Sequence, residues 1–340
     1  MKTVILGFSG GVDSAVCAVL LRKAGYAVQG VYLDNTDDAA LCCAEETAAS
    51  IGIPLSVIDI RQELEEKVCT PFLQSYLHGR TPNPCILCNP ALKFRTLLSV
   101  AEAGGANAIA TGHYARTQDG MLFRGHSEND QSYMLCRLFP SQAKRLLLPL
   151  GPYEKKEVRE LARSLFLPVA DKPDSMEICF IPDQDHIEWL ARRASVPGPG
   201  DILYEGKVIG AHKGIHTLTV GQRLPGLYAG RRLYVYCIDA DKNEIRACLW
   251  DDLFTHEFSA YDTRWLVSAP KTPIEARVQV RHTRWERPEC TIYPDDSLIR
   301  VHCDEPLRAP APGQAAAFYQ GDRLIGGGWI VQKMERRDNF

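Results

Sequence analysis

The sequence predicts an α/β protein in which a domain built on a parallel β-sheet is followed by a small central domain and a C-terminal β-barrel. Strand-like and helical patterns alternate through the first half of the chain. A proline- and glycine-rich segment then interrupts the helical pattern at residues 195–201, and short strand-like runs follow it. A chain of 340 residues also exceeds what one core usually organises. We therefore expect domains at residues 1–200, 201–260 and 261–340.

The first half of the chain begins with a βαβ unit and continues in the same alternation. Apolar spacing predicts strands at 3–8, 27–33, 55–60 and 108–111, and helices at 14–24 and 38–51. In parallel sheets of this kind, ligands bind beyond the carboxyl ends of the strands. Residues 9–11 and residues 112–113 both fall at such ends, so we expect them to share one site.

Beyond residue 200 the chain consists of short runs with strand character separated by turns. The runs lie at 207–210, 232–238, 244–248, 274–280, 290–293, 298–302 and 315–319, and another begins at 324. Regularly spaced short strands are typical of a barrel. Five arginines among them are candidate phosphate contacts: Arg264, Arg277, Arg281, Arg284 and Arg287.

Composition places the chain among globular proteins that are not embedded in a bilayer. It is 45% hydrophobic and 24% charged, and no apolar run approaches the roughly 18 residues that suggest a membrane span. The N-terminus has no signal-peptide pattern, so we expect a cytoplasmic protein whose cysteines stay reduced unless they bind metal or do sulfur chemistry. The net charge of −3 argues against indiscriminate binding of nucleic acid, but a local basic face remains compatible with RNA.

The most specific local feature is the loop between the first strand and the first helix. It consists of Gly7, Phe8, Ser9, Gly10, Gly11, Val12, Asp13 and Ser14. Glycines let backbone N–H groups approach an anion closely, and the serines and the helix N-terminus add donors, which predicts a pyrophosphate cradle. Asp13 is a candidate ligand for Mg²⁺ on the phosphates. The loop lacks the Gly-Lys-Ser/Thr ending of a Walker motif, and the alternative interpretation is a plain strand-to-helix turn.

Cysteines supply the second set of candidates. Cys85 and Cys88 form a Cys-x-x-Cys pair in a proline-rich loop, where Lys93 is near enough in sequence to favour a thiolate. The pair has three interpretations: half of a metal site, a redox pair, or one nucleophile beside an incidental thiol. Cys179 follows a charged, proline-bearing turn and is either reactive or buried. Cys42 and Cys43 lie near the expected nucleotide site, where a metal or regulatory role is the alternative to an inert pair.

Two levels of resemblance follow from these motifs. The segment Ser9-Gly-Gly-Val-Asp-Ser14 resembles the signature of the ATP pyrophosphatases, also called the PP-loop superfamily. Across the whole chain the sequence looks like a tRNA-specific 2-thiouridylase. The further motifs that carry this resemblance are Thr81-Pro-Asn-Pro84, Cys88-Asn89, Ala110-Thr-Gly-His-Tyr-Ala-Arg116, Asp130-Gln-Ser-Tyr133, Lys155-Lys-Glu-Val-Arg159, Asp174-Ser175, Ile178-Cys-Phe-Ile181, Gly210-Ala-His-Lys-Gly214, Thr219-Val-Gly-Gln-Arg223 and Gly326-Gly-Gly328.

The resemblance implies an ATP pyrophosphatase domain that adenylates the C2 oxygen of the wobble uridine in tRNA anticodons. Cys179 would carry a persulfide from a cysteine desulfurase or a sulfur-relay protein, and Cys88 would resolve the intermediate, with release of AMP and PPi. Implied contacts with Mg-ATP are the loop residues above together with Leu33 and Gly112. Implied contacts with tRNA are Asn83, Pro84, Cys85, His113, Asn129, Asp130, Gln131, Arg281, His282 and Gln314.

The sequence departs from the family pattern at three places. Arg281-His282 stands where Arg-Tyr is frequent, Cys85 stands where Asp is frequent, and residues 34–43 form a shorter segment than in many relatives. The resemblance implies no resident metal. Two rival functions are another ATP pyrophosphatase, such as an amidating synthetase, and a non-catalytic ATP- or RNA-binding relative. Neither rival requires Cys88 or Cys179.

Overall fold

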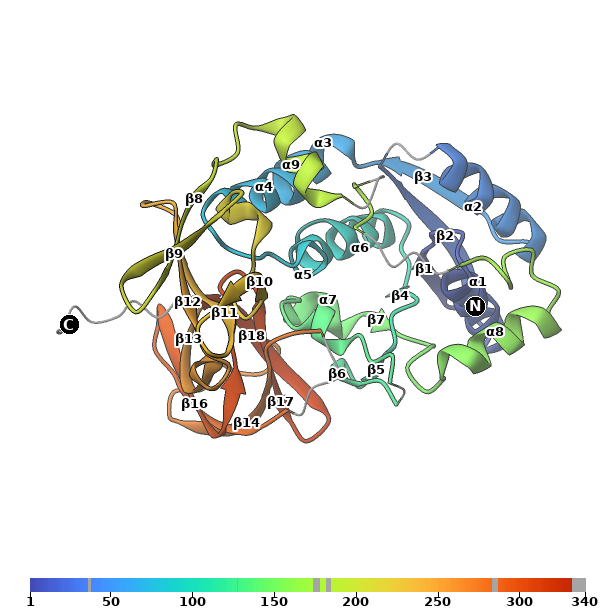
Figure 1. The fold of residues 1–340 in the computed structure, drawn as a ribbon. Helices are drawn as coiled ribbons and strands as arrows, with labels where there is room; N and C mark the ends of the chain where they lie inside the picture. Colours follow the sequence, from blue (N-terminus) through green and yellow to red (C-terminus); the bar gives the residue numbers. More distant parts are fainter. Residues whose placement is uncertain (36–37, 127, 174–177, 182–184, 283–286, 332–340) are drawn as a thin grey trace.

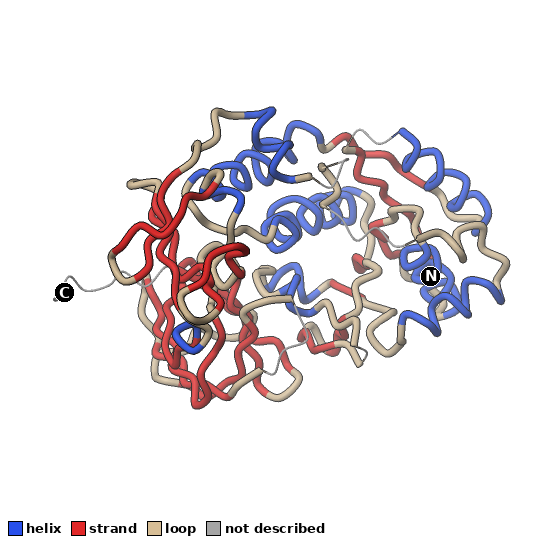
Figure 2. The backbone as a smooth tube through the Cα atoms, in the orientation of Figure 1, coloured by secondary structure: helices blue, strands red, loops and turns tan. Residues whose placement is uncertain are grey.

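The computed structural model describes residues 1–35, 38–126, 128–173, 178–181, 185–282 and 287–331. Helices gather in the N-terminal half and strands dominate the C-terminal half, and the two regions lie side by side (Figures 1 and 2). The parallel-sheet domain, a central domain and a closed antiparallel barrel confirm the predicted fold class. Among the described residues, no helix combines the length and apolar character needed to cross a membrane.

The N-terminal sheet has five parallel strands in the order β3-β2-β1-β4-β7. They are β1 (Thr3–Gly7), β2 (Ala27–Asp34), β3 (Leu55–Asp59), β4 (Ala108–Ala110) and β7 (Leu146–Leu147). The first helices are α1 (Val12–Lys23), α2 (Asp38–Ile51), α3 (Arg61–Leu64), α4 (Thr70–Leu77), α5 (Pro84–Cys88) and α6 (Phe94–Ala103). Later come α7 (Pro140–Lys144), α8 (Lys155–Ser164) and α9 (His186–Arg193).

Alternation along β1 assigns a separate core to each face of this sheet. Val4 and Leu6 pack in a cluster with buried residues of α1, α2 and α8, whereas Ile5 packs in another cluster with residues of α6 and α7. Successive side chains of a strand point to opposite faces, so a buried strand needs apolar residues at every position. Helices on both faces leave the carboxyl edge of the sheet open to ligands.

The central domain is a five-stranded sheet in the order β10-β11-β12-β8-β9. Its strands are β8 (Gly200–Tyr204), β9 (Lys207–His212), β10 (Arg223–Tyr228), β11 (Arg232–Asp239) and β12 (Glu244–Cys248). The pairings are antiparallel except between β8 and β12, which run parallel. Its own apolar cluster includes Leu233, Val235 and Ile245.

The C-terminal domain is a barrel closed by the pairing of β13 (Phe254–Trp265) with β18 (Arg323–Val331). Between them lie β14 (Ile274–Gln279), β15 (Glu289–Tyr293), β16 (Leu298–Arg308) and β17 (Ala315–Gln320). The hairpin of β5 (Ala115–Gln118) and β6 (Met121–Arg124) leaves the N-terminal domain and joins the barrel sheet, because β6 pairs with β18. Sequence patterns predicted neither β5 nor β6, so this connection between the domains is a new feature.

Candidate active site

The nucleotide loop connects β1 to α1 in the strand-turn-helix context that the sequence predicted. Gly11 is the N-cap residue of α1 and has no side chain that would cover the helix end. The first N–H groups of a helix have no intrahelical partner, so they remain available to an anion. Ser14 Oγ donates to the carbonyl of Gly11 at 3.0 Å and lies 3.3 Å from Ser9 Oγ. These contacts hold the loop closed around the helix N-terminus.

Gly10 is the position where the loop most needs glycine. Its φ is +71°, in the left-handed region, and a Cβ there would lie 2.6 Å from Cα of Ala44 in α2. The Cys43 thiol, in the same helix, is 3.7 Å from the Gly10 carbonyl oxygen. The loop is therefore packed directly against α2.

Gly112 brings the end of β4 against the same loop. A Cβ at Gly112 would lie 3.2 Å from the backbone carbonyl carbon of Asp13 and 3.3 Å from the backbone nitrogen of Ser14. The two segments predicted to share a site thus adjoin at the carboxyl edge of the sheet. Leu33, near the end of the neighbouring strand β2, is half-buried and packs against two apolar clusters.

Asp13 is held by two side chains from other elements. Lys155, the first residue of α8, places Nζ 2.8 Å from both carboxylate oxygens, and Tyr114 donates its hydroxyl to Oδ1 at 2.7 Å. Within the described ranges we find no group of three or more His, Cys, Asp or Glu side chains placed to hold a metal ion. Mg²⁺ commonly uses one or two carboxylates together with substrate phosphates. Asp13 supplies one such carboxylate, whose oxygens already accept hydrogen bonds from Lys155 and Tyr114.

Cys88 lies at the end of α5, in a continuous helical segment that reaches α6 through a π-helical turn at Asn89–Lys93. Asn83 begins the segment, because its Oδ1 accepts hydrogen bonds from the backbone nitrogens of Cys85 at 3.1 Å and Ile86 at 3.4 Å. Pro84 follows as the first helical residue, a position that tolerates the missing N–H. Such π-turns widen a helix locally and are frequent at functional sites.

Cys179 comes to Cys88 from a distant part of the chain. Its neighbours Ile178 and Phe180 pack against the apolar cluster that Cys88 also contacts, and its carbonyl oxygen accepts from Asn35 Nδ2 at 3.1 Å. Cys85, Cys88 and Cys179 are all free thiols. Cys85 and Cys179 are exposed, whereas Cys88 is half-buried. The structure therefore places the two predicted catalytic thiols in one neighbourhood.

Lys93 is the cation of this thiol group. Burial raises the pKa of Cys88 to about 11, the Lys93 ammonium opposes that shift, and Cys179 and Cys85 add to it. Desolvation also raises the pKa of Cys179. Cys85 adds to this rise, and the Lys93 ammonium again opposes it. Both cysteines are therefore thiols near neutral pH, and Lys93 favours the thiolate of each.

His113 directly follows Gly112 in the chain and is near enough to Lys93 to be influenced by its charge. Its Nδ1 lies 2.7 Å from the Thr111 hydroxyl, and its ring stacks on Phe94 with centroids 5.9 Å apart. Burial, with a smaller effect from Lys93, lowers the pKa of His113 to about 3. The imidazole is neutral at physiological pH and is suited to hydrogen bonding rather than to charge pairing.

Predicted tRNA contacts near residue 130 have protein partners in this structure. Asp130 Oδ1 accepts from the backbone nitrogens of Gly125 and Ser132, and Oδ2 lies 3.0 Å from Arg287 of the barrel. Gln131 Oε1 accepts from the backbone nitrogen of Tyr114 at 3.0 Å, while Asn129 is exposed. Contacts of these three residues with tRNA remain predictions.

The other predicted tRNA contacts lie where the domains meet. Arg281 donates to the carbonyl oxygens of Val220 and Ala309, which joins the barrel to the central domain. His282 is exposed and stacks on Tyr133 with centroids 6.3 Å apart. Gln314 donates to the carbonyl of Thr81, two residues before Asn83. Of the arginines predicted to contact phosphate, Arg284 lies outside the described residues.

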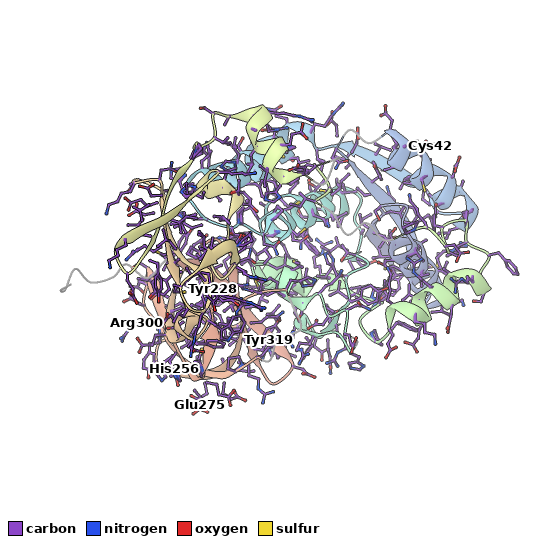
Figure 3. The ribbon with its side chains drawn as sticks, viewed as in Figure 1. Cys42, Tyr228, His256, Glu275, Arg300 and Tyr319 are labelled. Atoms are coloured by element: carbon purple, nitrogen blue, oxygen red, sulfur yellow. The ribbon has the colours of Figure 1, made fainter. Side chains whose placement is uncertain are left out.

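Cys42 and Cys43 differ in their surroundings. Cys42 is exposed on α2, at the end of the molecule away from the barrel (Figure 3), and its pKa is raised mainly by the charge of Glu46. Cys43 Sγ lies 3.2 Å from the ammonium of Lys172 and close to the Gly10 carbonyl. A metal or regulatory role for either thiol remains untested.

Sequence reasoning missed the partners of Asp13. Tyr114 and Lys155 stand in motifs that supported the resemblance, but no role was assigned to either residue. A partial signal was present for Tyr114 alone, because its motif follows the strand predicted at 108–111. Which of these side chains meets the loop depends on tertiary packing and could not be derived from spacing.

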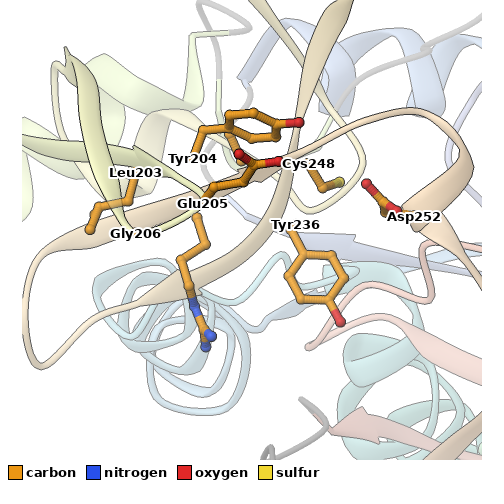
Figure 4. Close-up of a pocket in the computed structure, with 9 residues that line it drawn as sticks. Leu203, Tyr204, Glu205, Gly206, Tyr236, Cys248 and Asp252 are labelled. Atoms are coloured by element: carbon orange, nitrogen blue, oxygen red, sulfur yellow. The ribbon is translucent and has the colours of Figure 1, made fainter. Parts of the chain in front are cut away.

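A separate pocket of about 580 Å³ lies on the central domain and is lined mainly by residues of β8, β11 and β12 (Figure 4). Its lining includes Tyr204, Glu205, Tyr236, Cys248 and Asp252. No residue predicted for ATP or tRNA lines it, and we assign it no ligand.

The arrangement of domains and loop defines the class of protein. Three family models match the chain in order: a tRNA methyl transferase HUP domain at residues 2–183, a tRNA methyl transferase PRC-barrel domain at 188–248, and an aminomethyltransferase beta-barrel domain at 255–330. The first model alone covers more than half of the chain. The protein is thus a HUP-domain protein of the PP-loop type with two appended β-domains.

Curated relatives identify the family within this class. The tRNA-specific 2-thiouridylase MnmA of Syntrophotalea carbinolica is 42% identical over 347 residues, covering 97% of this chain and 99% of the relative. The enzyme of the same name from Chloroflexus aggregans is 41% identical over 356 residues, covering 98% and 99%. That of Clostridium acetobutylicum is 40% identical over 353 residues, covering 97% and 99%. The chain belongs to the tRNA-specific 2-thiouridylase family.

Proposed function

We propose that this protein uses ATP to replace the C2 oxygen of the wobble uridine in tRNA anticodons with sulfur. The relatives' names supply the reaction class, and one observation in this chain supports it most directly. The nucleotide loop follows β1, while two thiols from distant segments meet beside the ends of its neighbours β2 and β4. Activation by ATP and delivery of sulfur thus occur at one edge of one sheet.

Adenylation is the first step of the proposed reaction. A carbonyl oxygen of uracil is a poor leaving group, and transfer of AMP from Mg-ATP to that oxygen, with release of PPi, converts it into a good one. The amides at the start of α1 bind the phosphates, and Gly10 and Gly112 allow close approach of the backbone. The target base leaves the anticodon stack to reach this site, as enzymes acting on bases generally require.

Sulfur transfer follows in two nucleophilic steps. The terminal sulfur of a Cys179 persulfide attacks C2 and expels AMP, which forms a Cys179–S–S–C2 adduct. The Cys88 thiolate then attacks Sγ of Cys179, so that the S–S bond breaks and its electron pair remains on the nucleoside sulfur as 2-thiouridine. The product on the protein is a Cys88–Cys179 disulfide. A reductant supplies two electrons to restore both thiols.

Lys93 and His113 prepare the site for these steps. Lys93 stabilises the thiolate of Cys88, whose pKa is raised to about 11 by burial. His113, which directly follows Gly112, is neutral and serves as a hydrogen-bonding group in the site rather than as a charge. Asn83, Pro84 and Cys85, at the start of the helix that ends in Cys88, contact the displaced uridine. The persulfide comes from a cysteine desulfurase or a sulfur-relay protein.

Mass analysis of nucleosides tests this proposal. Unmodified tRNA is incubated with the protein, Mg-ATP and a persulfide donor, then digested, and the wobble uridine is examined for replacement of one oxygen by one sulfur. We expect the product only when ATP is present. An ATP-dependent amidation of a small acid, with no change in the tRNA, would instead support an amidating synthetase and would overturn the proposal.

A further inference from the structure

Two further cysteines face each other inside the C-terminal barrel, in a different domain from the catalytic thiols. Cys290 lies in β15 and Cys303 in the adjacent strand β16, and the antiparallel register places them directly opposite each other. This register continues as far as Tyr293 and Arg300 without a bulge. Cys290 is 3% exposed and Cys303 is 0% exposed, and both belong to the apolar cluster of the barrel. The proposed sulfur transfer uses neither thiol.

The two thiols are placed closely enough to be joined. Residues directly opposite on antiparallel strands have Cα atoms about 4.5–5.5 Å apart. A disulfide spans Cα atoms that are about 4.4–6.8 Å apart. A hydrogen bond to Cys303, together with burial, raises the pKa of Cys290, so the two sulfur atoms already contact each other. A bond between them therefore requires no slip of either strand.

We propose that Cys290 and Cys303 are a redox pair that forms a cross-strand disulfide in the core of the barrel. The oxidant is a small disulfide of the glutathione type. One cysteine thiolate attacks it and expels a first small thiol, and the other cysteine then attacks the mixed disulfide and expels a second. The pair loses two electrons and two protons, which leave with the two small thiols. This inference does not depend on the proposed use of ATP or tRNA.

Burial determines when this reaction can occur. A molecule the size of glutathione has no access to thiols that are 3% and 0% exposed, and the raised pKa of Cys290 keeps that thiol protonated. Oxidation therefore takes place while the barrel is folding, and the folded barrel then shields the bond from reductants. Cys179 is exposed, so a disulfide that includes it stays accessible. The barrel bond is thus a lasting modification, separate from the catalytic disulfide.

The central domain contains a matched control pair. Cys237 and Cys248 are also buried, each 6% exposed, and they lie on the paired strands β11 and β12. Cys237 is opposite Arg246, however, and Cys248 is opposite Tyr234. Diagonal neighbours of this kind are about 7–8 Å apart, which is beyond the reach of a disulfide without movement of the backbone. Burial on adjacent strands is therefore common to both pairs, and direct opposition is not.

Synthesis of the full chain under two redox conditions tests the proposal. The protein is made in a cell-free reaction that contains either reduced glutathione alone or a mixture of reduced and oxidised glutathione, so that it folds in the presence or absence of the oxidant. Free thiols are then blocked, and the disulfides are mapped by mass spectrometry. Thermal unfolding is recorded for both preparations of wild type, Cys290→Ala, Cys303→Ala and Cys237→Ala.

We expect a Cys290–Cys303 disulfide in most wild-type molecules made with the oxidant and no Cys237–Cys248 disulfide. The oxidised preparation should unfold at a midpoint about 5–10 °C higher than the reduced one, because the bond closes a short loop. Cys237→Ala should keep this difference. Cys290→Ala and Cys303→Ala should each lose it, although both can still form the catalytic disulfide.

Two results would overturn the inference. The first is a wild-type preparation in which Cys88 and Cys179 are oxidised while Cys290 and Cys303 remain free thiols. The second is an equal rise of the unfolding midpoint in Cys290→Ala. If neither alanine variant folds, the disulfide map of the wild type decides, because it requires no substitution.

Discussion

Replacement of Gly10 by alanine tests whether the nucleotide loop is shaped by its packing on α2. Gly10 has a φ of +71°, and a Cβ there would lie 2.6, 2.8 and 2.9 Å from Cα, N and Cβ of Ala44. Backbone atoms cannot move aside as a flexible side chain can. The loop must therefore shift, or α2 must be displaced.

The expected loss of folding stability in Gly10→Ala has two parts that a control variant can separate. A left-handed conformation costs alanine about 1–2 kcal/mol, and the close contact adds about 1–3 kcal/mol. Gly25 has a φ of +86° but no atom within 4 Å of its added Cβ, so Gly25→Ala bears only the first part. Gly10→Ala should therefore be less stable than Gly25→Ala by about 1–3 kcal/mol.

Binding and unfolding measurements should be made on both variants. We expect Gly10→Ala to bind α,β-methylene ATP at least about tenfold more weakly than wild type, because its backbone donors are displaced by a fraction of an ångström or more. Gly25→Ala should bind as wild type does. Equal stability and equal nucleotide affinity of the two variants would refute the assignment of this loop and its packing on α2.

Three further predictions concern the thiols and the junction of the domains. Because the pKa of Cys88 is about 11, its rate of alkylation by iodoacetamide should rise about tenfold per pH unit from pH 7 to 10 and level off near pH 11. A rate that is constant above pH 8 would contradict the raised pKa. Lys93→Met should move that profile to higher pH, whereas Lys156→Met should leave it in place, and an unmoved profile in Lys93→Met would exclude Lys93 as the cation. Arg287→Met should lower the free energy of unfolding by about 1–3 kcal/mol, because it removes a partner of the buried Asp130 carboxylate. The nucleotide affinity should not change. Unaltered thermal unfolding would show that the pair does not join the domains.

Local patterns predicted β1 to β4 of the N-terminal sheet, but not the two-residue strand β7, and they also predicted elements outside this sheet. The helix expected at 38–51 is α2 with the same bounds, and the strand at 244–248 is β12. Such segments combine strong periodicity with clear turn residues at their ends, so propensity and tertiary packing agree. The N-terminal loop was recognisable for the same reason, because its glycines meet a strand on one side and a helix on the other.

Other features depend on contacts between distant segments and left no local signal. The β5–β6 hairpin is short, and it becomes part of the barrel only through pairing with β18. Asp130 is a predicted tRNA contact. Its ion pair with Arg287, 157 residues away in the chain, could not be predicted from local spacing. The pairing of Lys155 with Asp13 is equally non-local. Motif spacing shows that these residues matter but does not reveal which neighbours they meet.

A single-turnover reaction tests the division of labour between the two thiols most directly. The protein is loaded with one persulfide sulfur, freed of donor and reductant, and mixed with unmodified tRNA and Mg-ATP, and peptides and nucleosides are then analysed by mass spectrometry. For the wild type we predict one 2-thiouridine for each loaded Cys179 persulfide and an equal amount of Cys88–Cys179 disulfide. Cys179→Ser should form no 2-thiouridine, and Cys88→Ser should release none. Full thiolation by either serine variant, or a disulfide that joins Cys85 instead of Cys88, would contradict the account.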